Sequence, residues 1–178
     1  MARDKTRRER YDLKSEAAIE MPLLIATVNF QFDDNIGFLI RSAACFGIRE
    51  LLIIGSVPER SSIYSKSGSL VDYMNIKTFP YPREFVTYCK DNDLNIVSAE
   101  ITEQSESIFD YNFDFSKRTV LVLGNETSGV PIEILLNSDV VHIPMPGVGY
   151  CLNTSQAGTS ILTEYSRRYG VCNEEKIL

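Results

Sequence analysis

The chain has 178 residues, 44% of them hydrophobic and 24% charged, with a formal net charge of −6. This length suits one domain with a full hydrophobic core, and the composition is that of an ordinary globular protein. No apolar run reaches the ~18 residues of a membrane span, and Glu16 and Glu20 before the first run argue against a signal peptide. We therefore predict a cytoplasmic protein with no membrane segment.

Apolar runs alternate with segments of helical periodicity along the chain, which is typical of an α/β fold. The polar residues 1–20 have helix-compatible spacing, 61–73 suggests a short helix and a loop, and 102–115 has no clear period. We predict strands over 23–30, 50–55, 75–79, 94–101, 118–124 and 139–145, and helices over 36–46, 82–92, 131–137 and 153–169. Gly47 and Gly170 would end two of these helices. The fold class is a mostly parallel sheet flanked by helices.

The cysteines and the single histidine have no spacing typical of a metal site. Cys45, Cys89, Cys151 and Cys172 form no CxxC pair, and His142 is the only histidine. The spacing therefore argues against a zinc site, and we expect no metal. The sequence predicts Cys45 and Cys89 as core residues of amphipathic helices, and His142 as a hydrogen-bonded histidine of a buried strand.

Three segments next to predicted strands combine glycine with polar side chains: NIGFLIRSAACFG (35–47), LVLGNETSGVP (121–131) and IPMPGVGYCLNTSQAGTSILTEY (143–165). In the third, glycines at 147 and 149 precede four polar residues at a predicted helix start, where one would suffice as a cap. Glycine lets a ligand approach the backbone, so a binding site is indicated. The small residues Gly147, Gly149, Ala157 and Gly158 also predict places where chain segments pass closely. Neither GxGxxG nor a P-loop is present, which disfavours Rossmann and P-loop proteins.

In order, these segments resemble the three motifs of the SpoU (TrmH-like) family of the knotted SPOUT methyltransferases, over roughly residues 23–170. The resemblance implies transfer of a methyl group from S-adenosylmethionine to a ribose 2'-hydroxyl of RNA. It also implies a deep trefoil knot in the C-terminal part and a homodimer whose first-motif arginine and cofactor pocket cooperate across the interface. The compact chain favours tRNA over rRNA as substrate.

By this resemblance, the catalytic residues are Arg41, Asn35, Glu126 and Asn153. The family's arginine is often described as a base, but a guanidinium stays protonated up to a pH of about 12. We expect Arg41 to bind phosphate beside the target ribose and to stabilise the developing alkoxide. Glu126 would fix Arg41 or orient a backbone loop. Structural alternatives are an N-cap for Asn35, a helix-capping acid for Glu126 and a solvated helix face for Arg41.

The resemblance also implies which residues line the cofactor pocket. Main-chain groups would contact the adenine edge and apolar side chains would flank the ring. Cys151 stands where the family often has serine, which weakens hydrogen bonding at that position. The cofactor-binding set is Ala99, Gly124, Asn125, Ile143, Met145, Cys151, Leu152 and Ser155.

A basic arm over residues 1–20 precedes a single domain over 21–178. Residues 1–10 carry a net charge of +3 (five basic and two acidic residues), which leaves −9 for the rest of the chain. The arm is interpreted as a solvated disordered tail, as an RNA-contacting segment, or as both. Two other functions stay open: an RNA-binding protein that has lost catalysis, and another α/β protein that binds nicotinamide or phosphate ligands.

Overall fold

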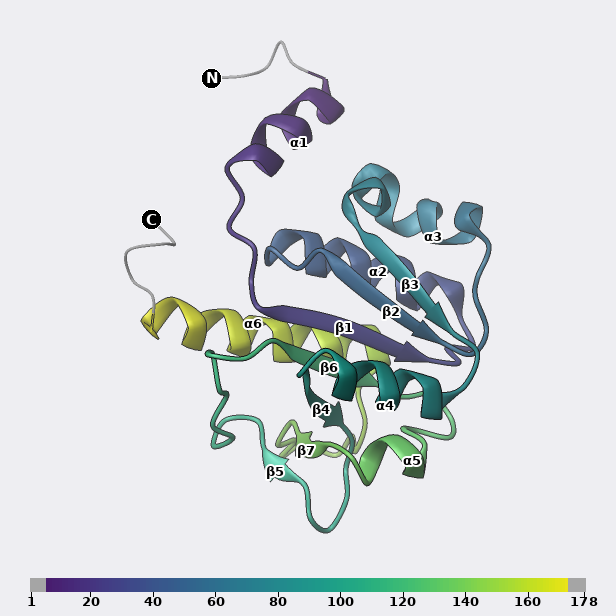
Figure 1. Cartoon of the computed structure of the whole chain (residues 1–178), viewed down its shortest axis with the longest axis vertical. Coiled ribbons are helices and arrows are strands. Elements are labelled where there is room, and N and C mark those ends of the chain that lie inside the picture. Colours follow the sequence, from purple (N-terminus) through teal and green to yellow (C-terminus); the bar gives the residue numbers. More distant parts are fainter. Residues whose placement is uncertain (1–5, 173–178) are drawn as a thin grey trace.

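The computed structural model describes residues 6–172, with side chains up to residue 170. The described residues form a parallel seven-stranded sheet with the strand order β3-β2-β1-β6-β4-β7-β5 (Figure 1). The central strands β1 and β6 are apolar and buried along their whole length, as parallel strands covered on both faces are. The strands are β1 Leu23–Val28, β2 Glu50–Ile54, β3 Asn75–Phe79, β4 Asn95–Ala99, β5 Glu106–Ser107, β6 Thr119–Leu123 and β7 Asp139–His142.

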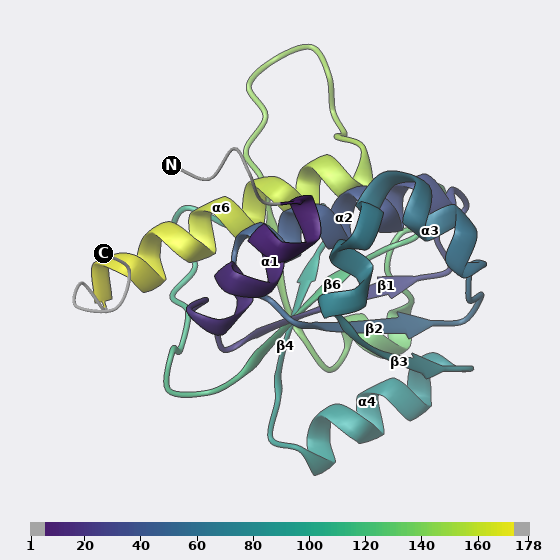
Figure 2. The same ribbon diagram turned by 90° about the horizontal axis from the view of Figure 1, so that it is seen from above.

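Helices cover both faces of the sheet because side chains alternate along each strand. Leu121 and Leu123 of β6 pack under α2 and α6, whereas Val120 and Val122 pack under α4 and α5. Figure 2 shows α2 and α6 side by side on one face and α4 on the other. The helices are α1 Arg7–Glu16, α2 Asp33–Cys45, α3 Arg60–Ser67, α4 Pro82–Asp91, α5 Ile132–Leu135 and α6 Thr154–Cys172, with a 3-10 helix, η1, at Gly68–Tyr73.

The predicted α/β class with a mostly parallel sheet is confirmed, and the differences concern element ends and one short additional strand. The last long strand ends at His142 rather than at residue 145, and irregular chain follows it. Helix α6 runs through Gly170 to Cys172. The predicted loop 102–115 contains β5, whose two residues pair with β7 and are too few to show a period.

The described part of the basic arm is a docked helix rather than a disordered tail. Thr6 and Glu9 form a capping box at the start of α1. The Tyr73 hydroxyl donates to Asp12 at 2.5 Å, and the rings of Tyr11 and Tyr73 meet edge to face at 6.3 Å. No residue of α1 is buried, so these polar and ring contacts attach it to η1. Residues 1–5 lie outside the described residues.

Small residues allow close packing at one of the predicted places and not at two others. A Cβ on Gly158 would lie 2.7 Å from methyl carbons of Leu39 and Leu123, so α6 passes close to α2 and β6. A Cβ on Gly147 or Gly149 would meet nothing within 4 Å, because both lie in an exposed loop. The prediction is therefore confirmed for Gly158 and wrong for the two loop glycines.

The two cysteines predicted to be core residues differ in burial. Cys89 is fully buried against the α4 face of the sheet, as predicted. Cys45 is exposed because the last position of α2 turns towards solvent, so its assignment to the core was wrong. Among the described residues, no helix combines the length and apolar character needed to cross a membrane.

Candidate functional site

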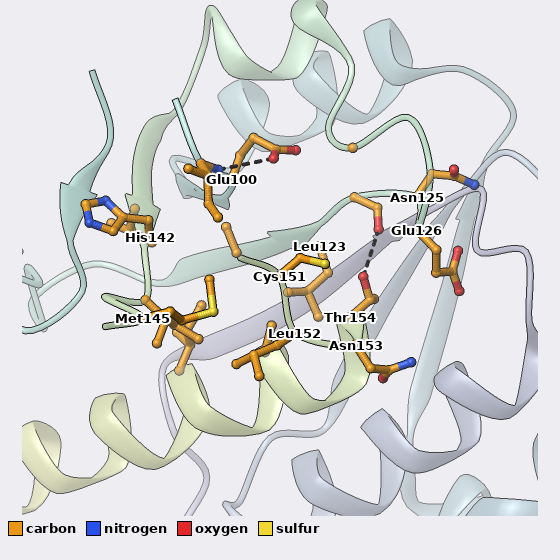
Figure 3. Close-up of a pocket in the computed structure, with 18 of the residues that line it drawn as sticks. Glu100, Leu123, Asn125, Glu126, His142, Met145, Cys151, Leu152, Asn153 and Thr154 are labelled. Atoms are coloured by element: carbon orange, nitrogen blue, oxygen red, sulfur yellow. Dashed lines mark hydrogen bonds between the residues drawn. The ribbon is translucent and has the colours of Figure 1, made fainter. Parts of the chain in front are cut away.

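A cavity of about 470 Å³ opens at the carboxyl ends of β4, β6 and β7, beside the start of α6 (Figure 3). Ligand sites of parallel α/β sheets lie at this edge, where strand ends and the following loops converge. Its apolar wall is formed by Ala99, Leu123, Val141, Ile143, Met145, Leu152, Ala157 and Ile161. The size is within the range of sites for small molecules and cofactors.

The loop after β6 brings bare main chain to the cavity. The backbone N–H groups of Asn125 and Gly129 each donate to the other's carbonyl at 3.0 Å, which closes a tight turn. A Cβ on Gly124 would lie 2.3 Å from the Gly129 carbonyl carbon, so only glycine fits there. Gly129 has a φ of +69°, a conformation that favours glycine. Both glycines therefore fix the shape of the cavity wall.

Three residues from the three motif segments form one hydrogen-bonded network beside the cavity. The Asn35 amide donates to Glu126 Oε1 at 2.6 Å, and the Asn153 amide donates to Asn35 Oδ1 at 3.0 Å. Asn35 is only 6% exposed. It lies inside the first turn of α2, whose N-cap is Phe32, so the alternative of an Asn35 cap is wrong. The side chain instead links segments 91 and 118 residues away.

Glu126 is held as a carboxylate by donors from two directions. The backbone N–H of Gln31 donates to its Oε2 at 2.8 Å, opposite the Asn35 amide on Oε1. Partial burial alone would raise the pKa of Glu126, but the hydrogen bonds from Gln31 and Asn35 outweigh it and hold the pKa below its usual value. Glu126 does not cap α5, which begins at Ile132. It orients the backbone at Gln31, one of the two roles expected for it.

Asn153 has a second task at the start of α6. Its Oδ1 accepts hydrogen bonds from the Ser155 backbone N–H at 2.9 Å and from the Ser155 hydroxyl at 2.7 Å. The Thr154 hydroxyl donates to the Gly124 carbonyl at 3.3 Å, the dashed line between these segments in Figure 3. The polar cluster therefore caps the helix and ties it to the loop after β6.

Seven of the eight residues predicted to bind the cofactor line this cavity: Ala99, Gly124, Asn125, Ile143, Met145, Cys151 and Leu152. The eighth, Ser155, is buried outside the lining and serves the helix cap. Glu100 and His142 also line the cavity and were not predicted as site residues. Each adjoins a predicted position in the sequence, so the strand ends could have indicated them.

Arg41 lies apart from this cavity. Its side chain is exposed on α2, and its guanidinium is close to Gly68 at the start of η1. Within the part of the chain that the structure describes, it makes no ion pair. Within one chain, Glu126 contacts Asn35 rather than Arg41, so this carboxylate does not fix the arginine of its own chain.

The charged residues that line the cavity are both acidic. Glu100 and Glu126 face it, and no Lys or Arg occurs among the described lining residues. His142 is half-buried rather than a core residue, and its Nδ1 lies 3.0 Å from the Ser105 hydroxyl oxygen. Such a lining favours a cationic ligand over a phosphate. No group of three or more potential metal ligands occurs among the described residues.

Residues 22–163 match the SpoU rRNA Methylase family. The chain is 34% identical over 142 residues to a 23S rRNA (uridine(2479)-2'-O)-methyltransferase of Streptomyces viridochromogenes, covering 75% of this chain and 48% of that protein. It is 26% identical over 135 residues to a tRNA (guanosine(18)-2'-O)-methyltransferase of Escherichia coli K12, covering 75% of this chain and 58% of the relative. The chain thus spans about half the length of these relatives.

Solved structures give the same picture over more of the chain. A TrmH/SpoU tRNA modifying enzyme of A. aeolicus superposes with a TM-score of 0.79 at 25% identity, over 95% of this chain and 85% of that one. The SpoU methyltransferase AviRb of Streptomyces viridochromogenes, in complex with the cofactor AdoMet, gives a TM-score of 0.71 at 29% identity. That match covers 86% of this chain and 60% of AviRb.

Proposed function

Because the chain belongs to the SpoU rRNA methylase family, we propose that it transfers a methyl group from S-adenosylmethionine to a ribose 2'-hydroxyl of RNA. The observation that carries this proposal is the network of Asn35, Glu126 and Asn153, which joins all three motif segments beside one cavity. Relatives named as rRNA and as tRNA 2'-O-methyltransferases support the reaction class.

The cavity has the chemistry that S-adenosylmethionine requires. Main chain at Gly124 and Asn125 offers hydrogen-bonding groups, while Ile143, Met145 and Leu152 offer apolar surface for an adenine ring. The acidic lining suits a sulfonium and would repel the phosphates of nicotinamide dinucleotides. When bound, the cofactor would supply a methyl group activated by the positive sulfur.

Arg41 is the proposed group for the RNA side of the reaction. Its permanent charge and planar fork suit a phosphate beside the target ribose, and the same charge would stabilise a developing alkoxide. Asn35, Glu126 and Asn153 are proposed to hold the cavity wall and the start of α2 in place for that step. Since Arg41 is exposed and outside the cavity lining of its own chain, we propose that it acts on the cavity of a second copy in a homodimer.

A mixing experiment tests this division of labour. A chain with Arg41→Ala keeps an intact cavity, whereas a chain with Gly124→Ala has a damaged cavity and keeps its arginine. In an equal mixture, random pairing makes half of the dimers mixed, and each mixed dimer has one complete site. At an S-adenosylmethionine concentration that leaves the weakened Gly124→Ala cavity largely empty, activity in the mixture should return to about a quarter of wild type, well above that of either variant alone. An inactive mixture of dimeric variants would contradict a shared site.

The enzymatic experiment uses purified protein, S-adenosylmethionine and separate tRNA and rRNA transcripts. A methylated 2'-oxygen blocks alkaline cleavage of the next phosphodiester, so mass spectrometry of alkali-treated RNA identifies the position. We propose tRNA as the better substrate. Cofactor and RNA binding without a methylated product would instead indicate an inactive RNA-binding protein. Binding of NAD without binding of S-adenosylmethionine would indicate another nucleotide-binding function.

We further propose a single domain over 21–178 after the basic arm, with a C-terminal trefoil knot and a cytoplasmic location. The close passage of Gly158 between Leu39 and Leu123 supports the knot, because threaded segments need small residues where they cross. An experimental structure whose backbone, pulled from both ends, leaves no knot would contradict it. A fluorescent fusion tests the location.

A further inference from the structure

Glu100, which follows β4, is a cavity residue with a fixed orientation. Its Oε2 accepts the backbone N–H of Val130 at 2.9 Å, and its Oε1 accepts the N–H of Ile101 at 3.1 Å. A Cβ on Gly129 would lie 2.3 Å from the same Oε2, so the carboxylate is seated closely against the loop after β6. Figure 3 shows it across the cavity from Met145 and Leu152.

The charge of Glu100 is not balanced by a neighbouring cation. It has no ion pair within the described residues, and the other charged lining residue, Glu126, is also an acid. Glu126 is turned to the side of the cavity where Asn35 and Gln31 donate to it. Glu100 therefore adds a second negative charge at a separate point of the wall, where partial exclusion of water strengthens its field.

This inference rests on the proposed function. The donor S-adenosylmethionine and its product S-adenosylhomocysteine share adenosine, ammonium and carboxylate groups, and they differ by one methyl group and one positive charge. On transfer, the sulfur keeps the electron pair of the broken S–C bond, the methyl carbon bonds to the ribose oxygen, and the hydroxyl proton is released. The sulfonium thereby becomes a neutral thioether. A negative cavity wall attracts the first form and not the second.

We propose that Glu100 is a specificity residue that makes the cavity prefer the sulfonium donor over the thioether product. The carboxylate favours entry of the charged donor, and this attraction disappears when the methyl group leaves, which assists product release. A purely structural role has a different signature. If Glu100 only held Val130 in place, its loss would weaken both ligands to the same extent, because both occupy the same cavity.

Calorimetric titration with each ligand separates these roles. Glu100→Gln keeps the size of the side chain and removes the charge. It also leaves the N–H of Val130 or of Ile101 without its acceptor, a loss that would weaken both ligands alike. We expect its affinity for S-adenosylmethionine to fall about threefold to tenfold, with less than a twofold change for S-adenosylhomocysteine. The matched control is Glu103→Gln, the same change at an exposed residue outside the cavity lining, which should leave both affinities unchanged.

Equal losses for the two ligands in Glu100→Gln would overturn the proposal and leave Glu100 a structural role in the loop. Unchanged binding of both ligands would also overturn it. A wild-type protein that binds neither ligand is a different result, because it would refute the proposed function as well. Thermal melting of each variant verifies that the protein used in the titration is folded.

Discussion

Asn35 and Arg41 belong to the same helix, α2, and lie in opposite surroundings. Asn35 is 6% exposed, and both ends of its amide are hydrogen bonded within the chain. Arg41 is exposed and has no ion pair within the described residues. One end of the motif is thus preorganised by the fold itself. The other end keeps its charge for another molecule, which we propose to be RNA bound to a second copy.

The largest expected effect comes from removing the exposed charge. Arg41→Ala should reduce the single-turnover methylation rate by about a hundredfold or more, as the loss of one key electrostatic donor does in other enzymes. The melting temperature and the affinity for S-adenosylmethionine should hardly change, because Arg41 is exposed and lies outside the cavity lining. Rate, melting temperature and affinity should be measured on one preparation.

Arg41→Lys is the conservative control for the same position. It keeps the charge and loses the planar fork, so we expect most of the rate to be lost here too. A folded Arg41→Ala protein with a near-normal rate would remove Arg41 from the proposed mechanism. Loss of stability with normal specific activity would make Arg41 a structural residue.

The next largest effect is expected at Gly124, in the cavity wall that the fold preorganises. Gly124→Ala puts a methyl group against the backbone of Gly129 and should cost about 1–3 kcal/mol of unfolding free energy, as overpacking does. It should also weaken S-adenosylmethionine binding, since the cavity wall must shift. Gly147→Ala adds the same methyl group in open space and should change neither quantity. Denaturant unfolding measures the stability of each variant, and calorimetry measures its affinity for S-adenosylmethionine. Equal changes in Gly124→Ala and Gly147→Ala would contradict the role of Gly124 in the cavity wall.

A smaller effect concerns the carboxylate of the network. Glu126→Gln replaces one acceptor oxygen by an NH2 group, which opposes the donor of either Asn35 or Gln31, and should cost about 1–2 kcal/mol at pH 7. Because the folded-state pKa of Glu126 is lowered, its contribution to stability is present above the unfolded value of about 4.3. It is lost as the pH falls through the folded value.

Chemical unfolding of wild type and Glu126→Gln across this pH range tests the sign. The stability difference between the two proteins should narrow as the solution is acidified. A stability difference that stays constant from pH 7 to a pH below the folded pKa of Glu126 would show that the charge of Glu126 does not stabilise the fold.

The sequence predicts the parts of this molecule that depend on local pattern. Apolar runs that end in glycine or polar residues mark the strands and their carboxyl ends. The cofactor residues were implied by the family resemblance, and seven of them line the cavity at these strand ends and before α6. The network escapes such reasoning, because its hydrogen bonds join residues 91 and 118 positions apart. The local pattern at Asn35 therefore left a plain helix cap open as an alternative to the catalytic role that the resemblance implies. Glu100 escaped as well, since an acid after a strand usually indicates only exposure.

The smallest expected effect concerns the basic helix α1. Arg7 and Arg10 are exposed on it, and unlike Arg8, which lies 3.5 Å from Asp72, neither pairs with an acid within the described residues. If they contact RNA phosphates, the double change to Ala should weaken RNA binding about threefold to tenfold near physiological salt. It should also reduce the slope of log affinity against log salt by about 1–2, since each lost phosphate contact removes nearly one unit. Cofactor affinity should stay constant, because α1 contacts η1 rather than the cavity.

The matched control is Arg83→Ala with Lys90→Ala, which removes two exposed charges from α4 on the other face of the sheet. Filter binding over a salt series compares the two variants. Equal salt slopes for the α1 variant and the α4 variant would mean that the charges of α1 are only solvated and that RNA binds elsewhere.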